Sequence, residues 1–481
     1  MKKIKVMHVF VFLIMLLIAT FLRFYNLEER FLFSGEIGHN LLEIKNAFEG
    51  HSIPLIGPPT SHPWLSFGPF FYWIYGPILY LFNFNPLSYA YFGAFISVCT
   101  VALNFFVIRS IFNYRVAVIS SVLMSVSPLF LSFSLGARFF AVIPLLSLIF
   151  LYMTVNIVRK KSKSVFLYGF LFGAMFSFHY TPIMLLPFML SVVLFARLKI
   201  ERVGLLSFIG GFLLAVLPII VYDFLNNTQM VKNIILWIPY RVAGFLGFYP
   251  KNTLSEFVVS ENASSIWSFF SESILPRQLS FISAIIYLSV TVYIFYIVKN
   301  AFKRKKFLNG EFILFVLMFW GLVSVFIHGS PPIHYFVPIL FAPIIFISLF
   351  LDNIFKTRNG KIVVVLLVFF IVFANLKYFF SSEWFYRQGV PQNVMYKEQK
   401  NIAKYIILQA GGTPFSLARI GVNDQFEGDY AQNYVYLLWL YGNEPKHNAK
   451  MKFTIYEDAS KFSMTKSKNK VVVGEVGITK E

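Results

Sequence analysis

Residues 6–22 read VMHVFVFLIMLLIATFL and contain no Asp, Glu, Lys or Arg. A helix needs about 20 mainly apolar residues to cross a bilayer, so this run predicts a membrane-spanning helix. Its basic start, MKKIK, is also typical of a secretory signal peptide, but no small-residue cleavage site follows the apolar run. We therefore expect a retained first span with a cytoplasmic N-terminus.

Similar apolar runs recur along the chain. Of its 481 residues, 57% are hydrophobic and 13% are charged, whereas a soluble domain carries roughly 25% charged residues. A soluble hydrophobic core also stops growing at about 250–300 residues. The composition therefore predicts an all-α polytopic membrane protein with about eleven spans. The candidate spans are 6–22, 88–108, 116–135, 139–158, 165–180, 181–196, 203–222, 279–298, 311–328, 334–351 and 362–380.

The formal charge of +20 has two candidate explanations, which are nucleic-acid binding and the anchoring of membrane spans by basic residues. With eleven spans and a cytoplasmic N-terminus, every strongly basic short loop lies on the cytoplasmic side, as the positive-inside rule requires. We therefore expect a multi-pass plasma-membrane protein without a nucleic-acid partner. The apolar run 68–84 preserves this pattern only if it lies in the outer interface. The basic loops are 109–115, 159–163, 197–202, 299–306 and 356–361.

Three longer segments, 23–87, 223–278 and 381–481, then face outward. In the last one, KEQKNIAKYIILQAGGTPF (397–415) predicts an amphipathic helix that ends at a Gly-Gly turn, and KNKVVVGEVGI (468–478) predicts a terminal strand. We therefore divide the chain into a transmembrane domain, 1–380, and a small extracytoplasmic α/β domain, 381–481.

Disulfide and metal chemistry have little support in this sequence. Cys99 is the single cysteine, which excludes a disulfide framework and a cysteine metal site within the chain. His328 and His334 are six residues apart across Pro-Pro, which is a weak metal signal. No cofactor is predicted, and a divalent metal is left as an option.

The stretch FSGEIGHN (33–40) places a carboxylate between two glycines directly after the first span. A solvated loop carboxylate is the simplest interpretation of Glu36. The alternative is a base: a carboxylate at the membrane boundary loses part of its hydration, which raises its pKa. Gly35 and Gly38 allow unusual backbone geometry and close approach of a ligand.

Two arginines are candidates for binding an anion at the outer boundary. Arg138 lies in a predicted outer turn, opposite the basic loops, where it either binds phosphate or extends to the lipid headgroups. Arg23 follows the first span. Other polar residues at predicted outer boundaries, each also explained as a capped helix end or a solvated side chain, are His39, His62, His179, Asp223 and His334.

Several short motifs, taken in order, resemble membrane glycosyltransferases of the C superfamily. The similarity is to the branch of dolichyl-phosphate-mannose-protein mannosyltransferases (glycosyltransferase family 39) and lipid A aminoarabinose transferases, and it covers roughly residues 6–350. The motifs are FLRFYNL (21–27), GEIGHN (35–40), NAFEGHSIPLIGPPTS (46–61), GPFFYWIYGPILYLF (68–82), FGAMFSFHYTPIMLLPFML (172–190), VLPIIVYDFLNN (216–227) and HYFVPILFAP (334–343).

The resemblance implies transfer of a sugar from a polyprenyl phosphate to an acceptor on the outer face, with inversion at the anomeric carbon. An acidic residue in the first outer loop, usually Asp, serves as the base in this family, and Glu36 falls on that position. This chain has Gly35–Glu36 where many relatives have an Asp-Glu pair. Arg138 and Arg23 are then candidates for binding the donor phosphate, and His39 for orienting the acceptor or Glu36.

Other functions remain open alongside this one. A transporter for lipid-linked saccharides would show inverted repeats and ionisable groups in mid-membrane. The sequence shows no repeat and almost no charge within the candidate spans. Loss of the paired acid also suits a non-catalytic envelope scaffold, and a ligase that moves a whole oligosaccharide is a third alternative. The sequence names neither the sugar nor the acceptor, which is a protein, a lipid or a glycan.

Overall fold

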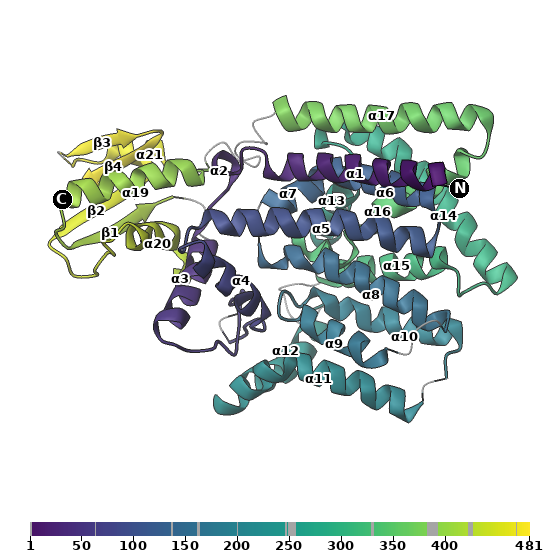
Figure 1. The fold of residues 1–481 in the computed structure, drawn as a ribbon. Helices are drawn as coiled ribbons and strands as arrows, with labels where there is room; N and C mark the ends of the chain where they lie inside the picture. The colour runs from purple at the N-terminus through teal and green to yellow at the C-terminus, as the bar shows by residue number, and fades with distance from the viewer. Residues whose placement is uncertain are drawn as a thin grey trace.

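The structure of the chain is a computed structural model in which helices predominate and a small sheet lies near the C-terminus (Figure 1). The N-terminus and the sheet lie at opposite ends of the helical bundle (Figure 1). The residues that the structure describes are 2–62, 64–135, 138–160, 164–199, 201–245, 248, 256–328, 331–381, 393–421, 427–467 and 469–481.

All eleven candidate spans coincide with helices, but their number as spans is not confirmed. Within the described residues, six helices are long and apolar enough to cross a membrane, or up to eight if each of two bent pairs is one span. Shorter apolar helices account for the rest. The long helices are α1 (Lys2–Phe24), α5 (Leu87–Ile111), η1 with α8 (Phe139–Val142, Ile143–Val158), α11 (Arg202–Leu225), η3 with α14 (Arg277–Leu279, Ser280–Arg304) and α17 (Arg358–Ser381).

Two pairs of helices are bent, and the first of them bends at a proline. One joins α6 (Tyr114–Val126) to α7 (Pro128–Leu135) with a bend of 60°, and the other joins η4 (Ile333–Ile339) to α16 (Ala342–Ile354) with a bend of 54°. Proline lacks the N–H that continues a helix, so Pro128 favours a break at this point. The remaining shorter helices are α9 (Val165–Met175), η2 with α10 (Thr181–Met184, Leu185–Ala196) and α15 (Gly310–His328).

The apolar run 68–84 forms a helix that is too short to cross a bilayer. Helix α4 (Phe70–Leu81) has 12 residues, or about 18 Å at 1.5 Å per residue, against a hydrocarbon core of about 30 Å. This length agrees with the interfacial position that we expected for the run. Pro77, inside the helix, also suits a short element.

The segment 223–278 contains two helices that the sequence analysis did not foresee, α12 (Gln229–Phe245) and α13 (Glu256–Ile274). Helix α13 packs inside the bundle, where the buried ring of Phe269 stacks on Phe336 with 4.4 Å between centroids. The Ser127 hydroxyl donates to the Ser273 carbonyl at 2.7 Å. The sequence analysis missed this helix because α13 is rich in small and polar residues, which are typical of loops. Such residues also allow close helix packing in membranes.

The C-terminal part is a small α/β domain. Its sheet has the order β1-β2-β4-β3, with β1 parallel to β2 and the other pairs antiparallel. The predicted amphipathic helix is α19, which ends at Gly411 in a left-handed conformation (φ 54°). The expected terminal strand is instead a hairpin, because Gly474 (φ 64°) turns the chain between β3 and β4. The elements are α19 (Tyr396–Ala410), β1 (Phe415–Ile420), η5 (Glu427–Asp429), α20 (Gln432–Leu440), β2 (Met451–Tyr456), α21 (Ala459–Met464), β3 (Lys470–Val473) and β4 (Val476–Lys480).

This α/β domain shares a hydrophobic core with the segment that follows α1. Helices α2 (Leu27–Arg30) and α3 (Gly35–Glu49) lie beside it in Figure 1. Phe31 and Leu41 belong to the same buried cluster as Tyr434 and Leu437 of α20. Burying these side chains together makes one structural unit of the start and the end of the chain.

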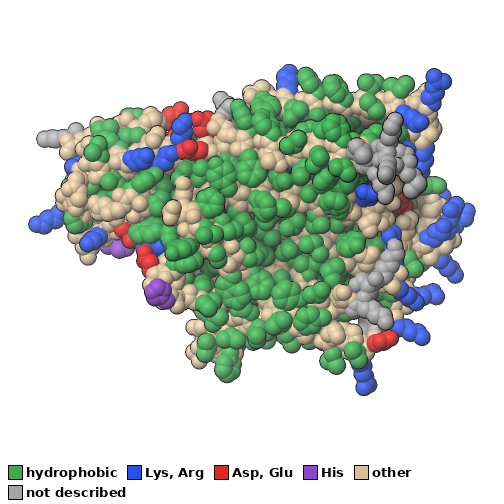
Figure 2. Space-filling view, in the orientation of Figure 1, with side chains coloured by type: hydrophobic (Ala, Val, Ile, Leu, Met, Phe, Trp, Pro, Cys, Tyr) green, Lys and Arg blue, Asp and Glu red, His purple; other side chains and the backbone are tan. Residues whose placement is uncertain are grey.

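The surface has the character expected of a membrane protein. Apolar side chains cover the middle of the face shown in Figure 2, and Lys and Arg side chains gather at the end where α1 begins. The basic end is therefore opposite the α/β domain, in agreement with the predicted charge asymmetry.

Candidate active site

Glu36 lies in the first turn of α3. Ser34 precedes this helix, and its side-chain oxygen accepts a hydrogen bond from the Ile37 N–H at 3.4 Å, which caps the helix N-terminus. A carboxylate in a first helical turn interacts favourably with the helix dipole. The stretch that sequence alone left as a loop is thus a helix start that points Glu36 toward a defined environment.

The Glu36 carboxyl is half-buried and surrounded by charge. Burial raises its pKa above the ordinary value for glutamate, while the guanidinium of Arg138 acts in the opposite direction. The carboxylate of Asp429 raises the pKa further, and His39 lowers it. A carboxylate whose pKa is raised accepts a proton more readily than a fully hydrated one, so the environment suits a base.

Arg138 stands at the start of η1 with its side chain exposed. Its guanidinium carbon lies 5.8 Å from the centroid of the Phe140 ring. Two histidines lie next to Phe140. The centroid of the His334 ring is 4.9 Å from that of the Phe140 ring, on which it stacks, and 5.5 Å from that of the His179 ring. The His179 Nδ1 is 3.0 Å from the Thr181 hydroxyl. The structure thus brings three sequence candidates from three separate turns to one place.

His39 contacts the α/β domain directly. Its Nδ1 lies 3.0 Å from an oxygen of Asp429 and 3.1 Å from the carbonyl oxygen of Gly428. The hydrogen bond to Asp429 raises the pKa of the His39 imidazole. His39 is therefore held by a residue that lies almost at the other end of the sequence.

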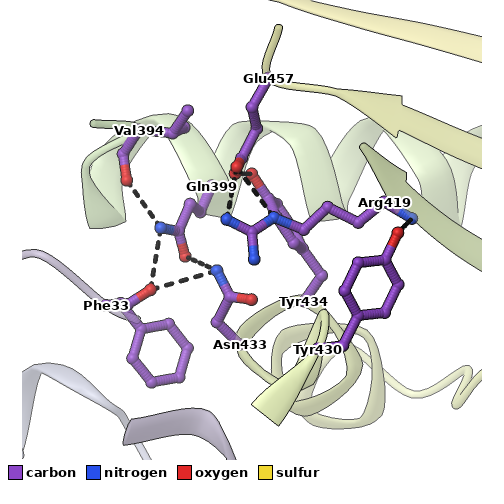
Figure 3. Close-up of polar contacts among 8 residues, drawn as sticks. All are labelled: Phe33, Val394, Gln399, Arg419, Tyr430, Asn433, Tyr434 and Glu457. Atoms are coloured by element: carbon purple, nitrogen blue, oxygen red, sulfur yellow. Dashed lines mark hydrogen bonds and ion pairs between the residues drawn. The ribbon is translucent and has the colours of Figure 1, made fainter. Parts of the chain in front are cut away.

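The α/β domain also fixes the residue that leads into α3 (Figure 3). The Phe33 carbonyl accepts hydrogen bonds from the Gln399 side-chain amide at 2.9 Å and from the Asn433 side-chain amide at 3.1 Å. Asn433 donates to the Gln399 carbonyl oxygen as well, at 2.9 Å. Behind them, Arg419 pairs with Glu457, and the Tyr434 hydroxyl donates to the same carboxylate. This buried network holds the Phe33 carbonyl, three positions before Glu36, in place.

Gly38 allows two helices to pack closely, whereas the sequence had suggested that it allows a ligand to approach. A Cβ atom at this position would lie 2.3 Å from the backbone nitrogen of Asn433. Such a distance is far inside van der Waals contact, so α3 and α20 meet backbone to backbone only because residue 38 is glycine.

Three other sequence candidates lie in different surroundings. The Arg23 side chain is fully buried and donates to Ser97 and to the carbonyl oxygens of Ala19, Met124 and Ser125. Asp223 accepts hydrogen bonds from the N–H groups of Met230 and Val231, which caps α12. His62 stacks on Trp64 with 5.4 Å between ring centroids. None of these contacts connects the three residues to Glu36.

Comparison with known proteins gives this arrangement a context. Residues 61–237 match the model of the dolichyl-phosphate-mannose-protein mannosyltransferase family. No curated protein sequence matches the chain. The chain is similar in fold to ArnT from Cupriavidus metallidurans in the apo state, with a TM-score of 0.57 and 11% identity over 100% of this chain and 98% of that one. This likeness shows that the chain has the fold of ArnT.

Two further structures share this fold. ArnT bound to undecaprenyl phosphate has a TM-score of 0.55 and 12% identity, with coverage of 98% of this chain and 97% of that one. The Archaeoglobus fulgidus oligosaccharyltransferase in the apo form has a TM-score of 0.53 and 13% identity, with coverage of 91% of this chain. This chain spans 64% of the length of that oligosaccharyltransferase.

Two residues of the candidate site were missed by sequence reasoning. Asp429 was missed because only the fold of the α/β domain brings it to α3. The Tyr89 hydroxyl is buried, lies within electrostatic reach of Glu36 and Arg138, and has no hydrogen-bond partner among the described residues. A tyrosine at the start of an apolar span is typical of an interfacial anchor, so the sequence did not indicate a place for Tyr89 in the site. The described residues contain no cluster of three or more His, Cys, Asp or Glu able to hold a metal ion.

Proposed function

We propose that the chain transfers a sugar from a polyprenyl-phosphate donor to an acceptor hydroxyl, with inversion at the anomeric carbon. The observation that carries this proposal is the position of Glu36, a half-buried carboxyl of raised pKa under the influence of Arg138. A base and a cation are the two groups that such a transfer needs. The similarity to ArnT in complex with undecaprenyl phosphate supports a lipid phosphate as the donor.

Each group has a defined part in the reaction. The acceptor oxygen gives its proton to the Glu36 carboxylate and forms a bond to C1 of the donor sugar. The bond between C1 and the phosphate oxygen breaks, and its electron pair leaves with the polyprenyl phosphate. The exposed guanidinium of Arg138 stabilises the charge that develops on that phosphate. Attack opposite the leaving group accounts for the inversion.

Arg138, rather than Arg23, is the phosphate-binding residue in this proposal. All the hydrogen bonds of Arg23 described above go to protein acceptors inside the bundle, and its side chain is completely buried. His179 and His334 lie beside Phe140, next to Arg138, and complete the wall that faces the donor. The reaction takes place at the end of the bundle that carries the α/β domain, which we place on the outer face of the plasma membrane.

The proposal is tested with purified protein in detergent and a radiolabelled polyprenyl-phosphate sugar. Release of the sugar from the lipid, in the presence of a cell-envelope extract that supplies acceptors, supports an enzyme. Absence of release, with the protein folded, would favour a non-catalytic scaffold. Movement of the intact donor across a vesicle bilayer without cleavage would favour a transporter. Parallel assays with monosaccharide and oligosaccharide donors separate a hexosyltransferase from an oligosaccharide ligase.

A further inference from the structure

A polar cleft lies between α3 and the α/β domain, beyond His39. It encloses about 450 Å³, within the range of about 300–1,000 Å³ that is typical of small-ligand sites. Its α3 wall carries His39, Glu43 and Asn46, and the opposite wall carries Ser416, Tyr430 and Gln432. The cleft therefore exists only where the two parts of the chain meet.

The proposed base lies on the same face of α3 as the residues that line the cleft. Residues 36, 39, 43 and 46 are separated by three, four and three positions, so they share one face of α3. Glu36 begins this polar stripe, and the lining of the cleft starts at His39, one helical turn further on. A molecule bound along the stripe would thus have one end at Glu36.

The chemistry of the walls favours an uncharged, hydroxyl-rich ligand. Side-chain amides, two carboxylates and two imidazoles supply hydrogen-bond donors and acceptors, and the ring of Tyr430, whose residue is 43% exposed, offers a flat apolar surface. Charges of both signs line the cleft: Glu43 and Glu444 are negative, and Lys446 is positive. No cluster of cations is present among the described lining residues to hold a phosphorylated ligand.

Neighbouring contacts make an extended peptide a poorer fit. Peptides commonly bind by adding a strand to an exposed sheet edge, and Ser416 and Leu417 of β1 line the cleft. However, the Phe415 carbonyl already accepts from the Lys446 N–H at 2.7 Å, and the Arg419 N–H donates to the Tyr430 hydroxyl at 3.0 Å. These bonds occupy main-chain groups of β1 that a peptide would need.

We propose that this cleft binds the acceptor, and that the acceptor is a neutral saccharide with one hydroxyl directed at Glu36. The identification of the ligand as the acceptor rests on the proposed function, whereas binding of a saccharide requires neither the donor nor turnover. The α/β domain would then supply half of the acceptor site, with the pair of His39 and Asp429 at the junction between cleft and base.

The test is binding of the full-length protein in detergent to an array of neutral oligosaccharides and to an array of Ser- and Thr-containing peptides. The wild type should bind a subset of the saccharides. Val435→Trp places a large ring in the cleft and should abolish that binding. Asn46→Ala changes only an exposed side chain and should weaken binding roughly two- to tenfold, as for the loss of one hydrogen bond.

One control separates the cleft from general effects. Leu408→Trp adds the same ring at a 76% exposed site on α19, away from the lining residues, and should bind like the wild type. Binding to peptides alone, binding to neither array, or saccharide binding unchanged in both Val435→Trp and Asn46→Ala would overturn the inference. A protein that binds saccharides but releases no sugar from the donor would instead refute the proposed function.

Discussion

The Nδ1 atom of His39 lies 3.0 Å from a carboxylate oxygen of Asp429, so helix α3 is paired with the short element η5 of the C-terminal domain. The His39 side chain is 26% exposed and that of Asp429 is 11% exposed, which limits screening of the pair by water. This contact, one helical turn from Glu36, makes the candidate site depend on docking of the α/β domain.

The pair should make stability depend on pH. Asp429 raises the pKa of His39 in the folded protein. The pair therefore stabilises the folded state fully below the ordinary histidine pKa of about 6.5, and this contribution is lost as the pH rises through the raised pKa of His39. Asp429→Asn should therefore lower the melting temperature in detergent more at pH 6 than at pH 9. Glu43, which also acts on His39, is unchanged in this variant.

Asp458→Asn is the matched control for that measurement. Asp458 caps α21 in the same domain, and its hydrogen bond with Ser460 lowers its pKa, so it stays ionised from pH 6 to pH 9. Its effect on the melting temperature should be the same at both values. An equal effect of Asp429→Asn at both values would show that the His39 pair does not titrate as described.

Gly38→Ala should destabilise the contact between α3 and α20. The added Cβ would lie 2.3 Å from the Asn433 nitrogen, and forcing an atom into a packed interface typically costs about 1–3 kcal/mol. We expect a lower melting temperature and lower activity. Gly204→Ala is the control, since nothing lies within 4 Å of a Cβ at that site in α11. Equal melting temperatures for the two variants would contradict this close packing.

Arg138 should control the acid limb of the pH–rate profile. Glu36 must be deprotonated to act as a base, and Arg138 lowers its pKa against the effect of burial. Arg138→Gln removes that charge, so the acid limb of kcat/KM should move to higher pH. Arg138→Lys keeps the charge but loses the forked geometry, so it should weaken binding of the donor phosphate with a smaller displacement of the limb.

Arg115→Gln is a control for the loss of one positive charge. Its guanidinium pairs with Asp352 at 2.8 Å, and Arg115 belongs to a predicted cytoplasmic loop rather than to the site. This variant should leave the acid limb in place. An unchanged limb in Arg138→Gln would show that the two groups are not coupled during catalysis.

Much of the helical architecture was predictable because apolar runs are local signals. All eleven candidate spans are helices, yet α13 was not foreseen, since its small polar residues are buried only by neighbouring helices. The site was predictable in part: motif order led to Glu36, and charge position led to Arg138. Asp429 and the role of Gly38 depend on contacts between residues about 390 positions apart, which no local pattern encodes.

The proposed membrane orientation rests on the charge asymmetry and can be tested directly. In a Cys99→Ser background, a single cysteine introduced at Ser463, an exposed residue of α21, should react with an impermeant maleimide in intact cells. A cysteine at Lys305, in the basic loop after α14, should react only in opened cells. The reverse pattern would place the candidate site on the cytoplasmic face and contradict the proposed orientation.

Transfer by Glu36→Gln under single-turnover conditions tests the central claim most directly. Glutamine keeps the shape and hydrogen bonding of the side chain but cannot accept the acceptor proton. With labelled polyprenyl-phosphate sugar at saturation, we expect donor binding and melting temperature close to wild type, and a transfer rate lower by about two orders of magnitude or more. Glu36→Asp should keep partial activity because it retains a carboxylate of shorter reach. A wild-type transfer rate in Glu36→Gln would contradict the assignment of Glu36 as the base.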